Sequence, residues 1–199
     1  MIKLFIVLFA CAVYSCTPDA QTMTISGKII FAGDETKTVK NTVIEAVGEQ
    51  SYQTAVKPDG TWSIEVQPGD YVIRPYKRTD TLNGIDLQDR TLIQQHLIAA
   101  APLGQWAKFA ADVNKNEIMT SHDGYIVGAA VIGVNDARAL VGGWWTFCPA
   151  GYVPQGITGF YVPVYPTTVQ VNATFGDVDS INFVGFRRGD VNMNANPEK

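Results

Sequence analysis

Hydrophobic and polar positions alternate with a period of two over residues 23–76. The stretch "MTISGKIIF" places Met23, Ile25, Gly27, Ile29 and Phe31 on one face, and "TWSIEV" repeats the pattern between the turns "KPDG" and "QPGD". This period is typical of strands that bury one face in a sheet. It predicts a small antiparallel β-sandwich domain over residues 23–76.

Beyond residue 76 the hydrophobic period becomes helical. "DLQDRTLIQQHLIAA" sets Leu92, Ile93 and Leu97 on one side, and "DGYIVGAAVIG" does the same with Tyr125 and Ile126. The stretch "PLGQWAKFA" between them predicts a short linking helix.

The two longer helices follow polar loops of similar length. Asp89 and Asp123, at the start of each helix, lie 34 positions apart, so "RTDTLNGIDLQD" and "DVNKNEIMTSHD" are interpreted as equivalent loops of a duplicated unit over residues 77–133. Residues 134–199 are expected to form a β-rich extension that packs on the preceding units. The fold class predicted is mainly β with a small α part.

The second loop carries side-chain oxygens at the offsets of a calcium loop. In a twelve-residue calcium loop the ligands come from positions 1, 3, 5, 9 and 12, and position 7 supplies a backbone carbonyl. A polar turn capped by the start of a helix is the alternative interpretation. The predicted ligands are Asp112, Asn114, Asn116, the Ile118 carbonyl, Thr120 and Asp123.

The first loop departs from this pattern because Arg78 takes its first position. A guanidinium has no acceptor atom and repels a cation. Asp80, Asp86 and Asp89 remain as ligands of a weaker second site. The alternative is that Arg78 pairs with Asp80 or Asp89 and replaces the metal.

The chain repeats half of the loop motif near its end. "GDVNMN" carries Asp190, Asn192 and Asn194 at the same offsets as the start of the second loop. Two roles stay open: this segment caps the first loop, or it is simply a polar terminal segment.

These motifs resemble two families. With "SGKI", "DGTWSIEV" and "PGDYVIRP", residues 23–76 resemble the prealbumin-like or carboxypeptidase-regulatory-like domains of bacterial exported proteins. With "ADVN" and "NGIDLQD", residues 77–133 resemble a type I dockerin, which implies bound Ca²⁺ and a protein partner such as a cohesin domain. The sequence departs from the dockerin pattern at the sixth loop position, where Glu117 replaces glycine and is expected to adopt a strained turn conformation.

The resemblance to dockerins also implies where a partner would bind. The partner is expected to contact the helices and the two residues before each closing aspartate, which are Leu87 with Gln88 and Ser121 with His122.

The first twenty residues, "MIKLFIVLFACAVYSCTPDA", have the features of an export signal, with a short apolar run after Lys3. "VYSC" predicts lipidation at Cys16, and cleavage after Ala20 with release of a soluble protein is the alternative. Either outcome places the protein outside the cytoplasm, at the cell surface or secreted. Cys148 then lacks a partner cysteine and is interpreted as a buried, inert thiol.

Composition narrows the functional classes. The 199 residues are 46% hydrophobic and 17% charged, which suits one core of ordinary size or two small ones. A net charge of −4 gives no basic surface for nucleic acid. Neither a glycine-rich phosphate loop nor a nucleophile elbow occurs in the sequence, so a non-enzymatic protein is expected.

The predicted function is an extracellular or cell-surface calcium-binding module for protein docking, adhesion or assembly, with membrane contact only through the lipid anchor. One alternative is a carbohydrate-binding surface that uses Trp144, Trp145 or Tyr152. Another is a purely structural domain braced by calcium.

Overall fold

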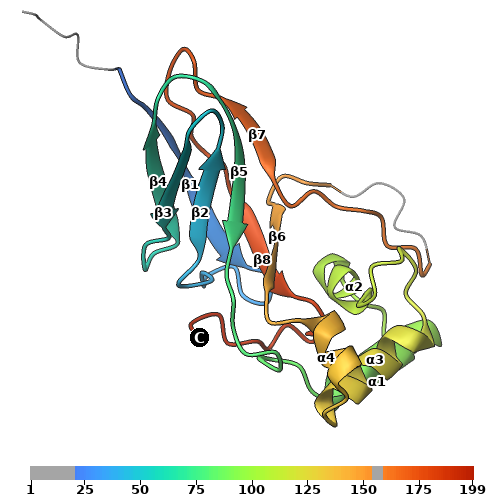
Figure 1. The fold of residues 1–199 in the computed structure, drawn as a ribbon. Helices are drawn as coiled ribbons and strands as arrows, with labels where there is room; N and C mark the ends of the chain where they lie inside the picture. Colours follow the sequence, from blue (N-terminus) through green and yellow to red (C-terminus); the bar gives the residue numbers. More distant parts are fainter. Residues whose placement is uncertain (1–20, 154–158) are drawn as a thin grey trace, which may run out of the picture.

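The computed structural model describes residues 21–153 and 159–199, so the expected export signal and Cys16 lie outside the described residues. Within these ranges the chain is mainly β, with two four-stranded sheets and four short helices (Figure 1). The strands are β1 (Met23–Phe31), β2 (Val43–Val47), β3 (Ser51–Ala55), β4 (Thr61–Val66), β5 (Asp70–Tyr76), β6 (Trp145–Pro149), β7 (Val169–Asn172) and β8 (Phe183–Arg187). The helices are α1 (Leu87–Leu97), α2 (Gln105–Ala111), α3 (Ser121–Val131) and α4 (Asn135–Val141).

Strands from both ends of the chain build both sheets. The orders are β4-β1-β8-β6 and β3-β2-β5-β7, so the C-terminal part completes the sheets that residues 23–76 begin. The expected sandwich is therefore not confined to residues 23–76. Nor is it purely antiparallel, because β1 pairs with β8 in parallel, with Ile29 opposite Phe183.

The alternating pattern of the first strands is confirmed by their burial. Ile25 and Ile29 on β1 are fully buried, as are Ile44 on β2 and Ile73 on β5. These side chains, which come from both sheets, belong to one hydrophobic core together with Trp62. The two sheets thus pack face to face in a sandwich-like arrangement.

The helices form a second core beside the sheets. α1 and α3 pack against each other, and both begin with the same capping box, in which Asp86 or Thr120 caps the helix and an aspartate three residues later bonds back. Ile93 from α1, Phe109 from α2 and Val127 from α3 are buried together. The predicted helices over these segments are confirmed, including the short α2.

Strand β8 joins the two cores. All five of its residues are buried, with Phe183 in the sheet core and Phe186 in the helix core. The tail, defined as residues 188–199, follows β8 without forming a named helix or strand and runs to the C-terminus marked in Figure 1. It contacts the start of α1 through the bond from Val191 to Asp89. Val191 is buried in the helix core and Ala195 in the sheet core, while Met193 packs against both.

In the part of the chain that the structure describes, no helix alone has the length and apolar character needed to cross a membrane. α3 and α4 meet that criterion only as a pair, and they are bent by 112° at their junction.

Candidate metal-binding sites

The start of α3 organises the loop before it through one carboxylate. Asp123 is fully buried. Its Oδ1 accepts the backbone N–H of Val113 at 3.0 Å and of Asn114 at 3.4 Å, and its Oδ2 accepts that of Thr120 at 2.8 Å. The two ends of the loop are therefore held against the first turn of the helix.

The front of this loop folds around a second carboxylate. Asp112 accepts the N–H of Asn116 and of Glu117, each at 3.1 Å, and the Asn114 side chain accepts the N–H of Asn116 at 3.0 Å. The turn is tight enough that Lys115 and Glu117 take φ values of 58° and 67°. The strained conformation predicted for Glu117 is thus confirmed, and it costs on the order of 1 kcal/mol or more.

The backbone carbonyl of Ile118, at the seventh position of the loop, points away from the neighbouring segment that contains Tyr161. Met119 N–H donates to the Phe160 carbonyl and Val162 N–H to the Glu117 carbonyl, each at 2.8 Å. Ile118 lies between these bonds in an antiparallel bridge, where the carbonyl of such a residue points away from the partner strand. We define the loop site as Asp112, Asn114, Asn116, the Ile118 carbonyl, Thr120 and Asp123.

The start of α1 has the same pattern of hydrogen bonds to an aspartate as the start of α3, but two of the donors come from the tail. Asp89 is fully buried. Its Oδ1 accepts the N–H of Val191 at 2.7 Å and of Asn192 at 3.0 Å, and its Oδ2 accepts that of Asp86 at 2.8 Å. The three backbone bonds to Asp89 match the three backbone bonds to Asp123 one for one, and Asp123 also accepts the Thr120 hydroxyl at 3.1 Å.

The tail also repeats the front of the loop. Asp190 accepts the N–H of Asn194 and of Ala195, each at 3.0 Å, and the Asn192 side chain accepts the N–H of Asn194 at 3.1 Å. These bonds correspond to those of Asp112 and Asn114. We define the split site as Asp190, Asn192 and Asn194 from the tail with Asp89 from α1 and Asp86, the residue that caps α1.

Two backbone features support the correspondence between the tail segment that begins at Asp190 and the loop segment that begins at Asp112. Met193 has a φ of 57°, as Lys115 has at the equivalent place. Just before the two motifs, Gly189 N–H donates to the Ala110 carbonyl at 2.8 Å, so the two segments run beside each other. Of the two roles left open for "GDVNMN", the contacts favour the one in which it caps the first loop, because Val191 and Asn192 bond to Asp89, the last position of that loop.

The front half of the first loop takes a different course. Arg78 stacks on Trp144, with 5.7 Å between the guanidinium carbon and the ring centre. The ion pairs among the described residues do not join Arg78 to Asp80 or Asp89. The carbonyl of Asp80 instead accepts the buried Arg187 guanidinium at 3.3 Å. The equivalence predicted for the two loops therefore extends only to their second halves.

Both sites place carboxylates together in a buried setting. Burial raises the pKa of Asp190 to about 7, and the charge of Asp89 adds to that effect. Burial raises the pKa of Asp89 to about 6, and the charge of Asp86 adds to that effect. Burial also raises the pKa of Asp112, and the charge of Asp123 adds to that effect. A bound cation would remove this penalty at either site.

The donor set suits a hard cation. Every group in the loop site is a carboxylate, amide, hydroxyl or carbonyl oxygen, which are the ligands of calcium. Asp123 Oδ1 already accepts two N–H groups, and its Oδ2 accepts both the N–H and the hydroxyl of Thr120, so a cation at Oδ2 requires the Thr120 hydroxyl to turn its hydrogen away. Among the described residues no group of three or more His, Cys, Asp or Glu side chains converges. Each site brings two carboxylates close enough to interact, Asp112 with Asp123 and Asp89 with Asp190. Asp86 lies at the ninth position of the first loop, which often binds calcium through a water molecule, and its side chain accepts the N–H of Gln88.

The predicted partner-binding residues lie at the exposed starts of the two helices. Leu87 is 52% exposed, and Gln88, Ser121 and His122 are also exposed. The hydrophobic period in the sequence placed Tyr125 with Ile126 on the apolar side of the helix, and this placement is wrong, because Tyr125 is 63% exposed and stacks with the His122 ring at 5.9 Å. Its spacing of three residues from His122 on one helix was the available signal.

The other candidate residues differ in how far solvent reaches them. Trp145 is 4% exposed, so only Trp144, at 50%, presents its ring to a ligand. Tyr152 is half-buried and packs in the helix core. Cys148 is fully buried, and burial raises the pKa of its thiol to about 12.

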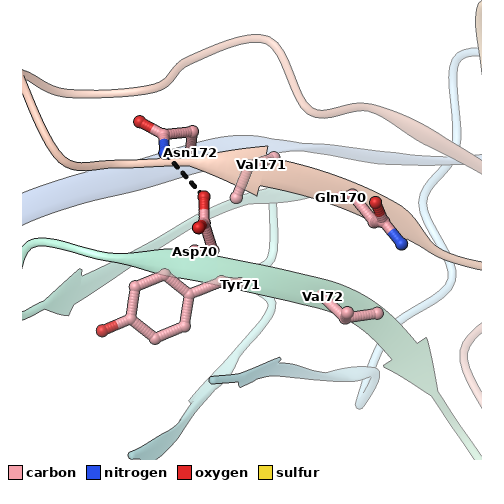
Figure 2. A pocket seen from close by; sticks show the side chains of 6 residues that line it. All are labelled: Asp70, Tyr71, Val72, Gln170, Val171 and Asn172. Carbon is pink, nitrogen blue, oxygen red and sulfur yellow. Dashed lines mark hydrogen bonds between the residues drawn. The ribbon is translucent and has the colours of Figure 1, made fainter. Parts of the chain in front are cut away.

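An open hollow of about 550 Å³ lies beside β5 and β7 (Figure 2). It is lined by Asp70, Tyr71, Val72, Gln170, Val171 and Asn172. Figure 2 shows the Asp70 carboxylate turned toward Asn172, whose amide donates to it at 2.6 Å. Because its one carboxylate is engaged, this hollow presents no pair of groups for acid–base chemistry.

No family model, curated protein or solved structure matches this chain.

Proposed function

We propose that this protein is a non-enzymatic, calcium-binding docking module that acts outside the cytoplasm, with α1 and α3 as a dockerin-like pair. The observation that carries the proposal is the framework of six hydrogen bonds that surrounds Asp123 and Asp112 and recurs around Asp89 and Asp190. A twofold arrangement of oxygen-rich loops, each closed by an aspartate in the first turn of a helix, suits a pair of calcium ions.

The loop site would hold its ion through Asp112, Asn114, Asn116, the Ile118 carbonyl, Thr120 and Asp123. Two carboxylates partly neutralise the ion, and the amides and the carbonyl complete the shell. With this charge count an affinity between about 10⁻⁶ and 10⁻³ M suits an extracellular module.

The split site would hold a second ion through Asp89 and Asp190, with Asn192 and Asn194 as amide ligands and Asp86 in the outer position. This assignment keeps Asp86 and Asp89 of the site expected at Asp80, Asp86 and Asp89 and replaces Asp80 with groups that the tail supplies. It also explains why Arg78 is tolerated, since Arg78 stacks on Trp144 instead of facing Asp89.

Calorimetric titration with Ca²⁺ tests the metal assignment. The wild type is expected to bind two ions per chain. The double variant Asp112→Ala with Asp123→Ala is expected to bind only the ion of the split site. The double variant Asp190→Ala with Asn192→Ala is expected to bind only the ion of the loop site. Asp80→Ala is the matched control and should bind both. Binding of no calcium by a folded wild type, as judged by circular dichroism, would reject the assignment.

Docking rests on the exposed starts of the helices. In α3 a hydroxyl, a titratable ring and a phenol lie together at Ser121, His122 and Tyr125, whereas α1 offers an apolar and an amide side chain at Leu87 and Gln88. A partner that fits one helix start should therefore reject the other, and we propose a single orientation centred on α3.

The docking test uses an extracellular protein that this chain captures from solution in the presence of Ca²⁺. Ser121→Ala with His122→Ala is expected to weaken its binding more than tenfold, and Leu87→Ala with Gln88→Ala to change it little. Equal losses from the two pairs would show that both faces are used.

A further inference from the structure

The tail links the two cores of the molecule through buried contacts. Val191 is 2% exposed in the helix core and Ala195 is 3% exposed in the sheet core. Met193 packs against both cores. When the tail is in place, the helices and the sheets are therefore bound to a common strip of chain.

Polar contacts continue this link beyond Ala195. The Pro197 carbonyl accepts the backbone N–H of Lys40 at 2.9 Å and the buried Lys77 ammonium at 2.8 Å. Asn83 and Asn196 bond reciprocally, with the Asn83 Oδ1 accepting the Asn196 N–H at 2.9 Å. These contacts fix the end of the tail to the segments that contain Lys40, Lys77 and Asn83.

The position of the tail against α1 has an electrostatic cost without a cation. Asp89 and Asp190 are both fully buried, and neither forms an ion pair among the described residues. Arg187 is the nearby cation, but its guanidinium donates to main-chain carbonyls, including those of Thr81 and Trp144. The charge of Arg187 therefore offsets that of Asp190 only in part, and two buried like charges that are incompletely compensated favour separation of the groups that carry them.

Separation is easier at the split site than at the loop site. The loop site lies on one continuous stretch between α2 and α3, and Lys115 and Arg188 are close enough to Asp112 to interact with its charge. The split site joins Asp89 to Val191, 102 positions away, and the tail is held by no strand or helix of its own. Movement of the tail alone would part its two carboxylates.

We propose that the tail is a calcium-dependent clasp, in which an ion between Asp89 and Asp190 fastens residues 189–199 across the helices and the sheets, and loss of the ion releases them. This inference rests on the proposed calcium binding. It goes further in assigning the split site control over the attachment of the two cores, while the loop site serves only the helix pair.

Hydrogen exchange with and without Ca²⁺ measures the clasp directly. The reporters are the amides that bond to the site carboxylates, Val191 to Ala195 in the tail and Val113 to Glu117 in the loop. If the ion binds only the closed tail, opening becomes rarer by the factor 1 + [Ca²⁺]/Kd. Exchange of the tail amides should therefore slow about 100-fold at a calcium concentration 100 times Kd.

Matched variants assign the effect to its site. Asn192→Ala is expected to abolish the calcium response of the tail amides alone, and Asn114→Ala, at the equivalent position, that of the loop amides alone. Glu198→Gln removes an exposed ion pair with Lys40 and should leave both responses intact.

The outcomes separate the clasp from the proposed function. Calcium protection of the loop amides without protection of the tail would overturn the clasp and leave calcium binding standing. A tail that is equally protected in chelator, or whose response survives Asn192→Ala, would overturn the clasp as well. No calcium response in either segment would reject the proposed function itself.

Discussion

Substitution of Gly84 by alanine tests how the first loop meets the tail. Gly84 has a φ of 81°, and a Cβ added there would lie 2.5 Å from the Cα of Ala195. The left-handed conformation costs alanine roughly 1–2 kcal/mol. The contact involves backbone and cannot be relieved by a rotamer change, so overpacking adds about 1–3 kcal/mol. Gly84→Ala should therefore destabilise the protein by about 2–5 kcal/mol.

Two other glycines separate these costs. Gly133 has a φ of 100° and a Cβ there would meet only the end of Arg138 at 3.9 Å, so Gly133→Ala carries the conformational cost alone. A Cβ at Gly151 would meet nothing within 4 Å, and its φ is not positive, so Gly151→Ala should be nearly neutral. Urea unfolding at a saturating Ca²⁺ concentration, where the tail is expected to stay in place, gives the three free energies of unfolding.

Calcium titration of Gly84→Ala adds a second measurement. Displacement of Ala195 moves the backbone that bonds Asp190, so the variant should lose one of the two proposed ions, and the ion that remains should belong to the loop site. A loss of stability no larger than that of Gly133→Ala would show that the tail does not pack against Gly84, and the reasoning about the split site would fail.

Three further predictions concern buried groups. Burial lowers the pKa of Lys77 to about 8, below its unfolded value of 10.5, so the folded chain loses this proton first and the wild type gains stability as the pH rises above 8. In urea unfolding, the free energy of unfolding of the wild type minus that of Lys77→Met should increase by up to about 1.4 kcal/mol per pH unit between pH 8 and 9. A difference that does not change with pH would contradict this prediction. Phe109, which is 1% exposed and lies 4.6 Å from the Tyr165 ring, should cost about 3–5 kcal/mol when changed to alanine, and a loss below 1 kcal/mol would refute its place in the core. Cys148 should resist a maleimide at neutral pH until denaturant is added, because its thiol is buried and its pKa is raised; peptide mass spectrometry detects the label, and rapid labelling of the native protein would show that solvent reaches it.

The loop site could be predicted from sequence because all its groups lie within twelve residues. The offsets of Asp112 and Asp123 define a closed turn that depends on no distant part of the chain. The strands over residues 23–76 were predictable for a related reason, since alternation records which face is buried. The strain at Glu117 followed from the position alone.

The split site could not be assembled from sequence in the same way. Asp89 and Val191 lie 102 positions apart, and no local pattern states that they meet. The repeated motif "DVN" signalled that the tail belonged to a loop, but only the course of β8 decides which helix it reaches. Without that course, the groups nearest to Asp89 in sequence, such as Asp80, were the natural expectation.

The sheets show the same limit. The parallel pairing of β1 with β8 joins strands from opposite ends of the described chain, and alternation along β1 does not name its neighbour. α4 was not expected within residues 134–199. Like α2 it has seven residues and no side-chain cap, but unlike α2 it does not lie between two predicted helices. Trp144 and Trp145 are adjacent, and only the strand register decides that Trp145 faces the core.

The pairing of β1 with β8 also determines at what point during synthesis the chain can complete its fold. During synthesis β1 emerges early, yet its neighbour on one side is complete only after residue 187 and the split site only after residue 195. Until then one edge of β1 offers unpaired backbone groups to any other strand, which favours misassembly between nascent chains. The contacts that close the fold have large sequence separation, so folding is expected to be slow compared with a helical protein of this size. A chain stalled before β8 would therefore expose the edge of β1 and carry a complete loop site at the same time.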